Sequence, residues 1–174
     1  FGCDSFATIQ AGINGVATGG TVNVAAGTYS ENVLVNKSVS LLGSGDETPT
    51  GTIVSPNGGN AIAVSADDVT LSGLHIDPQG SGRGVLVAAS IDDLLMDQVT
   101  ATNATNGLRV GTGIILDGLT VTNSHFDGNL LQGWYLSEET PSDGMVTNVN
   151  VTNTTFNNNV NKGIYAEKLD NAVF

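Results

Sequence analysis

The chain has 174 residues, a length that fits one domain, and it carries a net charge of −12 with only five basic residues. So few lysines and arginines argue against a nucleic-acid partner, because neutralising phosphates requires clustered cations. One cysteine excludes an internal disulfide framework, and no apolar run is long enough to insert into a membrane. The 23 glycines, with many Thr, Asn and Val, favour an extended β surface over a helical one.

The chain opens with a segment that predicts a short helix. Residues 4–14 place apolar side chains near one face, and Asp4 or Ser5 is expected to be the N-cap. A stack of strands needs such a cap, since its first layer would otherwise expose bare core and unpaired edges. Residues 1–18 are therefore predicted to cap a β domain that spans residues 19–174.

Short runs of alternating apolar residues follow the helix, and a period of two predicts strands. These runs are residues 21–24, 33–35, 37–43, 53–54 and 62–64. Residues 44–51 contain two acids and a proline and are predicted to form a loop between two of the runs.

From residue 69 the chain repeats itself, and equivalent apolar positions recur at steps of 25, 25 and 30 residues. Within each copy the apolar residues alternate, skip one position, alternate again, and alternate a third time after a polar loop. Each copy therefore supplies three short strands, and none can bury its inward face unless the next copy stacks on it. Stacked copies would pair in parallel at about 4.8 Å, which makes a parallel β-helix.

The skipped position is expected to be a tight bend. Gly73, Gln98, Asn123 and Asn153 occupy it, and Gly and Asn tolerate the positive φ that such a bend favours. Asn above Asn can also join side-chain amides along a stack. Gly73, Asn123 and Asn153 are therefore predicted to form a structural ladder, which Gln98 weakens.

The three-strand repeat, the Asn-bearing bend and the opening Phe6-Ala-Thr-Ile-Gln-Ala-Gly-Ile resemble the superfamily of pectate lyases, polygalacturonases and pectin methylesterases. The opening most resembles the first turn of a pectin methylesterase. This resemblance implies an all-β fold: a right-handed parallel β-helix of about six rungs, three strands per rung, with a short N-terminal capping helix. The fold hosts many activities. Because the catalytic signatures of all three enzyme classes are missing, no catalytic residue is carried over.

One row of the repeat suggests a binding face. Along the third strand of each copy, alternation points Leu86, Arg109, Tyr135 and Tyr165 outward. An arginine beside two stacked aromatic rings is a candidate sugar platform, and the resemblance implies that this face carries substrate. Aromatic pairing for stability alone is the alternative. A register slip of one residue would expose Trp134 instead.

Aspartates recur just before the first strand of the copies. Asp67, Asp92 and Asp117 are predicted to stack in one column at about 4.8 Å, and Asp68 with Asp93 in a second, shorter one. Carboxylates at so short a separation raise one another's pKa or recruit a cation, and their hard oxygens suit calcium. These five are the candidate metal ligands, and calcium is the one cofactor considered. Solvent-screened acids on turns are the alternative.

Two histidines share a register. His75 and His125 lie two rungs apart with Thr100 between them, a separation of about 10 Å at the rung spacing. That distance is too long for both to bind one metal at ordinary ligand distances. They are predicted to be surface ladder residues, with a lone base as the alternative.

The connections after the third strands lengthen along the chain, over residues 88–93, 111–118 and 137–148. Insertions on one edge of a solenoid often mark its working face, and drift in a tolerant loop is the alternative. Residues 168–174 begin another rung without a capping helix. We therefore expect further rungs beyond this chain, or self-association through this end.

The sequence thus predicts an extracellular or cell-surface module, a rigid acidic scaffold that binds polysaccharide or spaces other domains without its own catalysis. One alternative is a carbohydrate-active lyase, epimerase or hydrolase acting on acidic polysaccharide. The other is a self-assembling fibre subunit.

Overall fold

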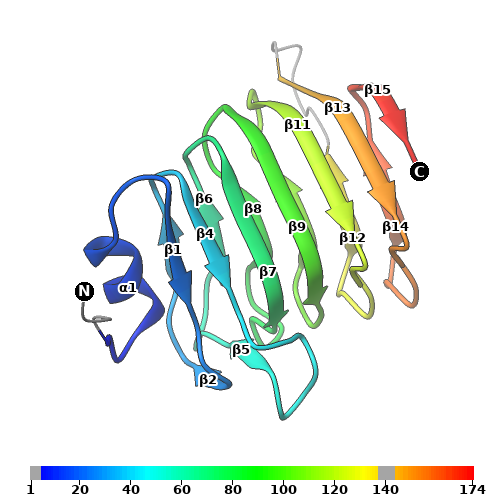
Figure 1. The fold of residues 1–174 in the computed structure, drawn as a ribbon. Coiled ribbons are helices and arrows are strands. Elements are labelled where there is room, and N and C mark those ends of the chain that lie inside the picture. Colours follow the sequence, from blue (N-terminus) through cyan, green and yellow to red (C-terminus); the bar gives the residue numbers. More distant parts are fainter. Residues whose placement is uncertain (1–4, 137–143) are drawn as a thin grey trace.

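A computed structural model describes residues 5–136 and 144–174. The chain coils in a right-handed sense about one axis, and each strand pairs in parallel with its equivalent one turn later (Figure 1). Helix α1 (Ile9–Gly15) covers one end of the coil. The predicted right-handed parallel β-helix with an N-terminal helix is confirmed.

The strands form two sheets. Sheet A has the order β1-β4-β7-β9-β11-β13-β15, with β2 paired to β5 and β5 paired to β7, and sheet B has the order β14-β12-β10-β8-β6-β3. The strands of sheet A are β1 (Gly20–Asn23), β2 (Gly27–Tyr29), β4 (Val39–Leu42), β5 (Thr52–Val54), β7 (Val69–Ile76), β9 (Ile91–Ala101), β11 (Ile115–Thr122), β13 (Met145–Thr152) and β15 (Leu169–Val173). Those of sheet B are β3 (Val33–Val35), β6 (Ile62–Val64), β8 (Arg83–Val87), β10 (Asn106–Val110), β12 (Gln132–Leu136) and β14 (Lys162–Ala166).

The strands make six rungs, and β15 begins a seventh. In the first two rungs, sheet A receives two separate strands per turn. In β7 and β9 the same two segments run together as one kinked strand, because the bend between them takes a single residue. After β11 and β13 the second segment no longer forms a strand. Its position is marked only by isolated bridges that join His125 to Thr100 and to Thr155.

Inward side chains of both sheets form one core. Val85 and Val87 of β8 are fully buried, as are Leu71 of β7 and Leu119 of β11. Aromatic rings fill the core toward the C-terminal end, where the Trp134 ring meets Phe126 and Phe156 edge-on, with centroids 5.4 and 4.9 Å away. Since Trp134 is buried, the side chain of Tyr135 next to it points outward.

The bend after the first segment has the geometry expected of it. Gly73, Gln98, Asn123 and Asn153 have φ of 63°, 51°, 49° and 50°. The Asn153 amide donates to the Asn123 side-chain oxygen at 2.8 Å, and the Asn123 amide donates to Asp97 at 2.8 Å. The side-chain ladder therefore continues to Asp97 and bypasses Gln98.

Each of the four rungs from β7 to β14 contains two further bends with positive φ that the apolar pattern does not reveal. One column of bends consists of Asp68, Asp93, Gly118, Asn148 and Asn171, and the other of Gln79, Asn103, Gly128 and Asn158. Left-handed backbone is least costly for Gly, Asn and Asp, which hold most of these positions. Asp68 and Asp93 therefore have a backbone role.

The helix begins later than the sequence suggests. Thr8 is the N-cap, and its hydroxyl oxygen accepts a hydrogen bond from the Ala11 amide at 3.1 Å. The expectation that Ser5 caps the helix is wrong, because the chain becomes helical only at Ile9. Asp4 lies outside the described residues. No helix in the described part of the chain is long and apolar enough to cross a bilayer.

Two side chains fasten α1 to the first rung. The Glu31 carboxylate accepts hydrogen bonds from the amides of Ile9 and Gln10 at 2.8 and 3.0 Å. The Gln10 side chain accepts from the Leu34 amide at 2.7 Å and donates to the Leu34 carbonyl at 3.1 Å. Leu34 belongs to β3, the last strand of sheet B. A side-chain amide thus takes the place of a neighbouring strand at this edge.

We expect Glu31→Ala to lower the free energy of unfolding by about 1–2 kcal/mol, the usual contribution of a carboxylate at a helix start. Urea denaturation followed by circular dichroism measures the change. Glu47→Ala is the matched control, since Glu47 is exposed and its removal should cost less than about 0.5 kcal/mol. Equal losses in the two variants would contradict the role given to Glu31.

Candidate functional site

The outward row on sheet B is a contiguous cluster of side chains. Backbone pairing places Leu86, Arg109, Tyr135 and Tyr165 side by side on β8, β10, β12 and β14. The Arg109 guanidinium carbon lies 4.4 Å from the centroid of the Tyr135 ring. The Tyr135 and Tyr165 rings stack at 5.5 Å with an angle of 23° between their planes. A cation and two stacked aromatic rings therefore form one strip along the axis.

The strip is flanked by opposite charges at Tyr165. The Lys162 ammonium nitrogen lies 4.6 Å from the centroid of the Tyr165 ring, and the Tyr165 hydroxyl donates to the Glu167 carboxylate at 2.6 Å. That hydrogen bond, and next the charge of Glu167, raise the pKa of Tyr165. The ring is thus oriented by a cation at its face and an anion at its hydroxyl.

A second polar column runs beside this row. Arg83, Asn106, Gln132 and Lys162 are in register at the start of the sheet B strands. The Asn106 amide donates to the Gln132 side-chain oxygen at 2.6 Å, and both residues are buried. The Nε atom of Arg83 is buried and has no hydrogen-bond partner within the described structure. In the sequence a polar residue stands directly before the glycine of each third strand, and the alternation of apolar residues does not mark it.

Positive charge gathers on this side of the molecule. Arg83, Arg109 and Lys162 lie in sheet B strands, and Lys37 and Lys168 lie in the turns between a sheet B strand and the next sheet A strand. The Lys37 ammonium group binds the C-terminal end of α1, where it donates to the Asn14 and Val16 carbonyls at 3.3 and 3.0 Å. In a chain with a net charge of −12, this side is the one suited to an anionic ligand.

The first aspartate column is held together by hydrogen bonds. Asp92 pairs with Asp117 across β9 and β11, and the Asp67 carboxylate accepts from the Asp92 amide at 2.9 Å. Asp117 accepts from the Thr147 hydroxyl at 2.7 Å and from the Asn148 amide at 2.6 Å. The Thr147 bond first, and then the Asn148 bond, lower the pKa of Asp117. The carboxylates of Asp67 and Asp117 are therefore engaged by protein donors.

The second aspartate column ends early. Asp68 and Asp93 occupy bends with φ of 54° and 55°, and the next bend residue is Gly118. A Cβ atom at Gly118 would lie 2.3 Å from a carboxylate oxygen of Asp93, so the Asp93 side chain occupies that space. Within residues 5–136 and 144–174, no three His, Cys, Asp or Glu side chains are grouped closely enough to hold a metal ion. Calcium binding stays a prediction.

His75 and His125 lie in one column with Thr100 between them, as backbone pairing shows. They belong to sheet A and not to the sheet B row. Of the three connections that lengthen along the chain, the longest includes residues 137–143, which lie outside the described residues. Its role as a working face stays a prediction.

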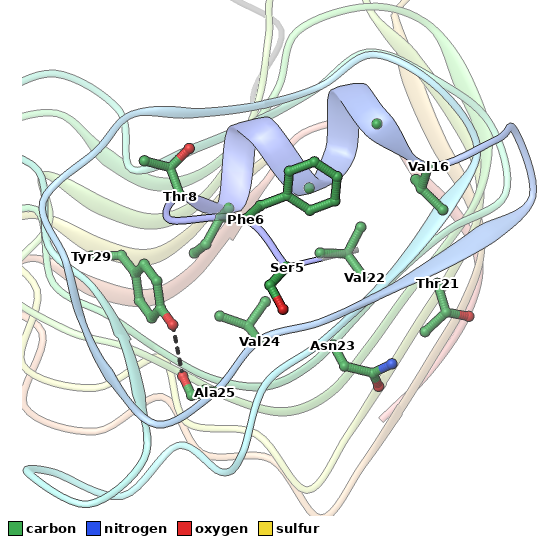
Figure 2. A pocket seen from close by; sticks show the side chains of 13 residues that line it. Ser5, Phe6, Thr8, Val16, Thr21, Val22, Asn23, Val24, Ala25 and Tyr29 are labelled. Atoms are coloured by element: carbon green, nitrogen blue, oxygen red, sulfur yellow. Dashed lines mark hydrogen bonds between the residues drawn. The ribbon is translucent and has the colours of Figure 1, made fainter. Parts of the chain in front are cut away.

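A hollow of about 540 Å³ opens between α1 and the first rung (Figure 2). Phe6, Val22 and Val24 form much of its wall, and the Tyr29 hydroxyl donates to the Ala25 carbonyl at 3.1 Å. None of the described residues that line it is charged. The hollow is thus the end of the apolar core that α1 covers incompletely.

No protein-family model and no curated protein matches the chain. A solved structure of a pectin methylesterase in complex with a hexasaccharide is similar, with 14% sequence identity and a TM-score of 0.42. The match covers 86% of this chain and 63% of that one, so the chain spans less than two thirds of the enzyme. Identity and score this low carry no argument about activity.

We expect the Tyr165 hydroxyl to titrate above the ordinary tyrosine pKa of about 10, because its proton is held by Glu167. Since the folded pKa is raised, the contact stabilises the fold below pH about 10, and this contribution is lost as the pH rises through the raised value.

The difference in tyrosinate ultraviolet absorbance between the protein and its Tyr165→Phe variant measures this titration. Glu167→Gln should lower the midpoint toward the ordinary value. A midpoint that Glu167→Gln leaves unchanged would show that the carboxylate does not hold the proton.

Proposed function

We propose that the protein is a polysaccharide-binding β-helix module whose binding face is the outward side of sheet B. The observation that carries this proposal is the continuous strip of Arg109, Tyr135 and Tyr165. Phenol hydroxyls exchange hydrogen bonds with sugar hydroxyls, and a guanidinium pairs with carboxylates in two parallel hydrogen bonds. One face therefore offers both contacts that an acidic sugar polymer needs.

Acidic polysaccharides fit this face better than neutral ones. Lys162 and Arg83 lie in the column beside the strip, and the rest of the chain is strongly acidic. An anionic chain would gain Coulomb energy only along sheet B, and repulsion elsewhere would confine it there. Binding should therefore weaken as salt screens these charges.

We further propose that the module acts without its own catalysis, as a rigid spacer in an extracellular or cell-surface protein. The absence of the enzyme signatures from the sequence and the continuous parallel ladders support this. A lyase, epimerase or hydrolase acting on the same ligand is the alternative that the experiment below separates. Self-association through the end that contains β14 and β15 stays a prediction.

Isothermal titration with polygalacturonate, and with dextran as a neutral control, tests the binding face. We expect polygalacturonate to bind, dextran to give no heat, and Arg109→Gln to weaken binding about tenfold, as loss of a charge-assisted hydrogen bond does. Tyr135→Ala should weaken it by a similar factor. Thr70→Ala, on the outward side of β7 in sheet A, should leave the affinity unchanged.

Arg109→Lys separates stacking from charge, because lysine keeps the charge and loses the planar contact with Tyr135. It should retain part of the affinity. Unsaturated or shortened products in the titrated mixture would contradict the non-catalytic spacer and favour the enzyme alternative. Affinity that is the same in Arg109→Gln, Tyr135→Ala and Thr70→Ala would remove sheet B from the proposal.

A further inference from the structure

The chain contains three asparagines that are followed directly by glycine, in the pairs Asn14-Gly15, Asn57-Gly58 and Asn106-Gly107. In such a pair the backbone nitrogen of the glycine can attack the side-chain carbonyl carbon of the asparagine, because glycine has no Cβ atom to hinder the approach. Two conditions favour this attack in a folded chain. The glycine amide is free of hydrogen bonds, and the asparagine side chain is free to turn toward it.

The pair in α1 is protected by hydrogen bonds. Asn14 and Gly15 are the last two residues of the helix, and a helical amide donates to the carbonyl oxygen four residues earlier. The Asn14 side-chain oxygen also accepts a hydrogen bond from the Gln10 side chain at 3.1 Å. Attack at this pair would therefore break hydrogen bonds of both the amide and the side chain.

The pair in sheet B is protected by burial. Asn106 begins β10 and is 3% exposed, and its side-chain nitrogen donates to the Gln132 side-chain oxygen at 2.6 Å. A Cβ atom at Gly107 would lie only 2.7 Å from the Gly133 carbonyl oxygen, so the next strand packs directly against this glycine. Neither residue can turn here without breaking contacts between the rungs.

The third pair lies in the turn between β5 and β6 and meets both conditions. Asn57 is exposed, and no hydrogen bond joins its side chain to another described residue. The Gly58 amide likewise has no hydrogen-bond partner in the described part of the chain. A Cβ atom at Gly58 would have one neighbour within 4 Å, the Ser81 hydroxyl oxygen at 3.9 Å. The space around this glycine is therefore open.

The conformation of the turn requires glycine after Asn57. Gly58 has a φ of 141° and Gly59 a φ of 76°, and residues with a side chain rarely adopt such angles. The Asn32 side-chain nitrogen holds the turn by donating to the carbonyls of Gly58 and Asn60 at 2.8 and 2.7 Å. These bonds engage carbonyl oxygens and leave the Gly58 amide free. The same turn that the rung needs thus contains the reactive pair.

We propose that Asn57 is a site of spontaneous modification, at which the protein loses ammonia through a cyclic imide. The Gly58 nitrogen bonds to the Asn57 side-chain carbonyl carbon, and the bond from that carbon to the side-chain nitrogen breaks. The released nitrogen takes up the proton of the Gly58 amide and leaves as ammonia. Water then opens the imide at either carbonyl. The products are aspartate and isoaspartate, each with one more negative charge than asparagine.

Incubation of the folded protein at mildly alkaline pH, followed by digestion at acidic pH and mass spectrometry of the peptides, tests the assignment. Alkaline solution speeds the reaction, because the attacking nitrogen must lose its proton. We expect Asn57 to convert about tenfold faster than Asn14 or Asn106, the factor for a barrier difference of about 1.4 kcal/mol, since only these two must first break hydrogen bonds. Equal rates at Asn57 and Asn14 would overturn the assignment.

The unfolded chain separates the effect of the structure from that of the sequence. In concentrated guanidinium chloride all three pairs are exposed and free of their native hydrogen bonds. We expect their rates of conversion to become similar. A preference for Asn57 that persists unchanged in the unfolded chain would show that the fold does not select this site.

A matched pair of variants provides a second measurement. Asn57→Gln and Asn14→Gln each replace an asparagine that precedes glycine, and the longer glutamine side chain forms the corresponding ring more slowly. We expect Asn57→Gln to remove most of the ammonia that the folded protein first releases, and Asn14→Gln to leave this release unchanged. The same release from Asn57→Gln as from the unaltered protein would place the reaction elsewhere.

Discussion

The structure depends on one constraint, the parallel hydrogen-bond ladder between successive rungs. Each strand pairs with its equivalent one turn later, so residues at corresponding positions are held about 4.8 Å apart along the axis. Side chains therefore meet as columns of equivalent positions. The core, the bends, the Arg109 strip and the histidine column are all columns of this kind, and each gains its chemistry from what is stacked above and below it.

The ladder also explains what the sequence could predict. Alternation and the repeat step are local properties, and they suffice for the parallel coil and for the outward row of Arg109, Tyr135 and Tyr165. Bends with positive φ are different, because they leave only a weak trace in residue type. The bend at Asn123 is marked by its asparagine, whereas that at Asp68 resembles any acidic turn.

Contacts made by loops could not be predicted at all. Asp46 and Thr100 are 54 residues apart, and they meet because the loop between β4 and β5 reaches past the rung of His75. Likewise, Glu31 meets the start of α1 only because the first rung returns beneath the helix. No periodic pattern contains such information. Thr8 became the cap in place of Ser5 because Thr8 itself is still extended and the chain becomes helical only at Ile9.

The buried indole of Trp134 has a consequence for how this coil comes apart. It is the single tryptophan of the chain, and it lies between Phe126 and Phe156 near one end of the stack. In a solenoid each layer is stabilised mainly by its neighbours, so the ends can open before the middle does. The emission of this indole therefore reports the fraying of the last layers, while the far-ultraviolet signal of the sheets reports the whole coil. Any separation between the two transitions would measure how cooperatively the layers melt.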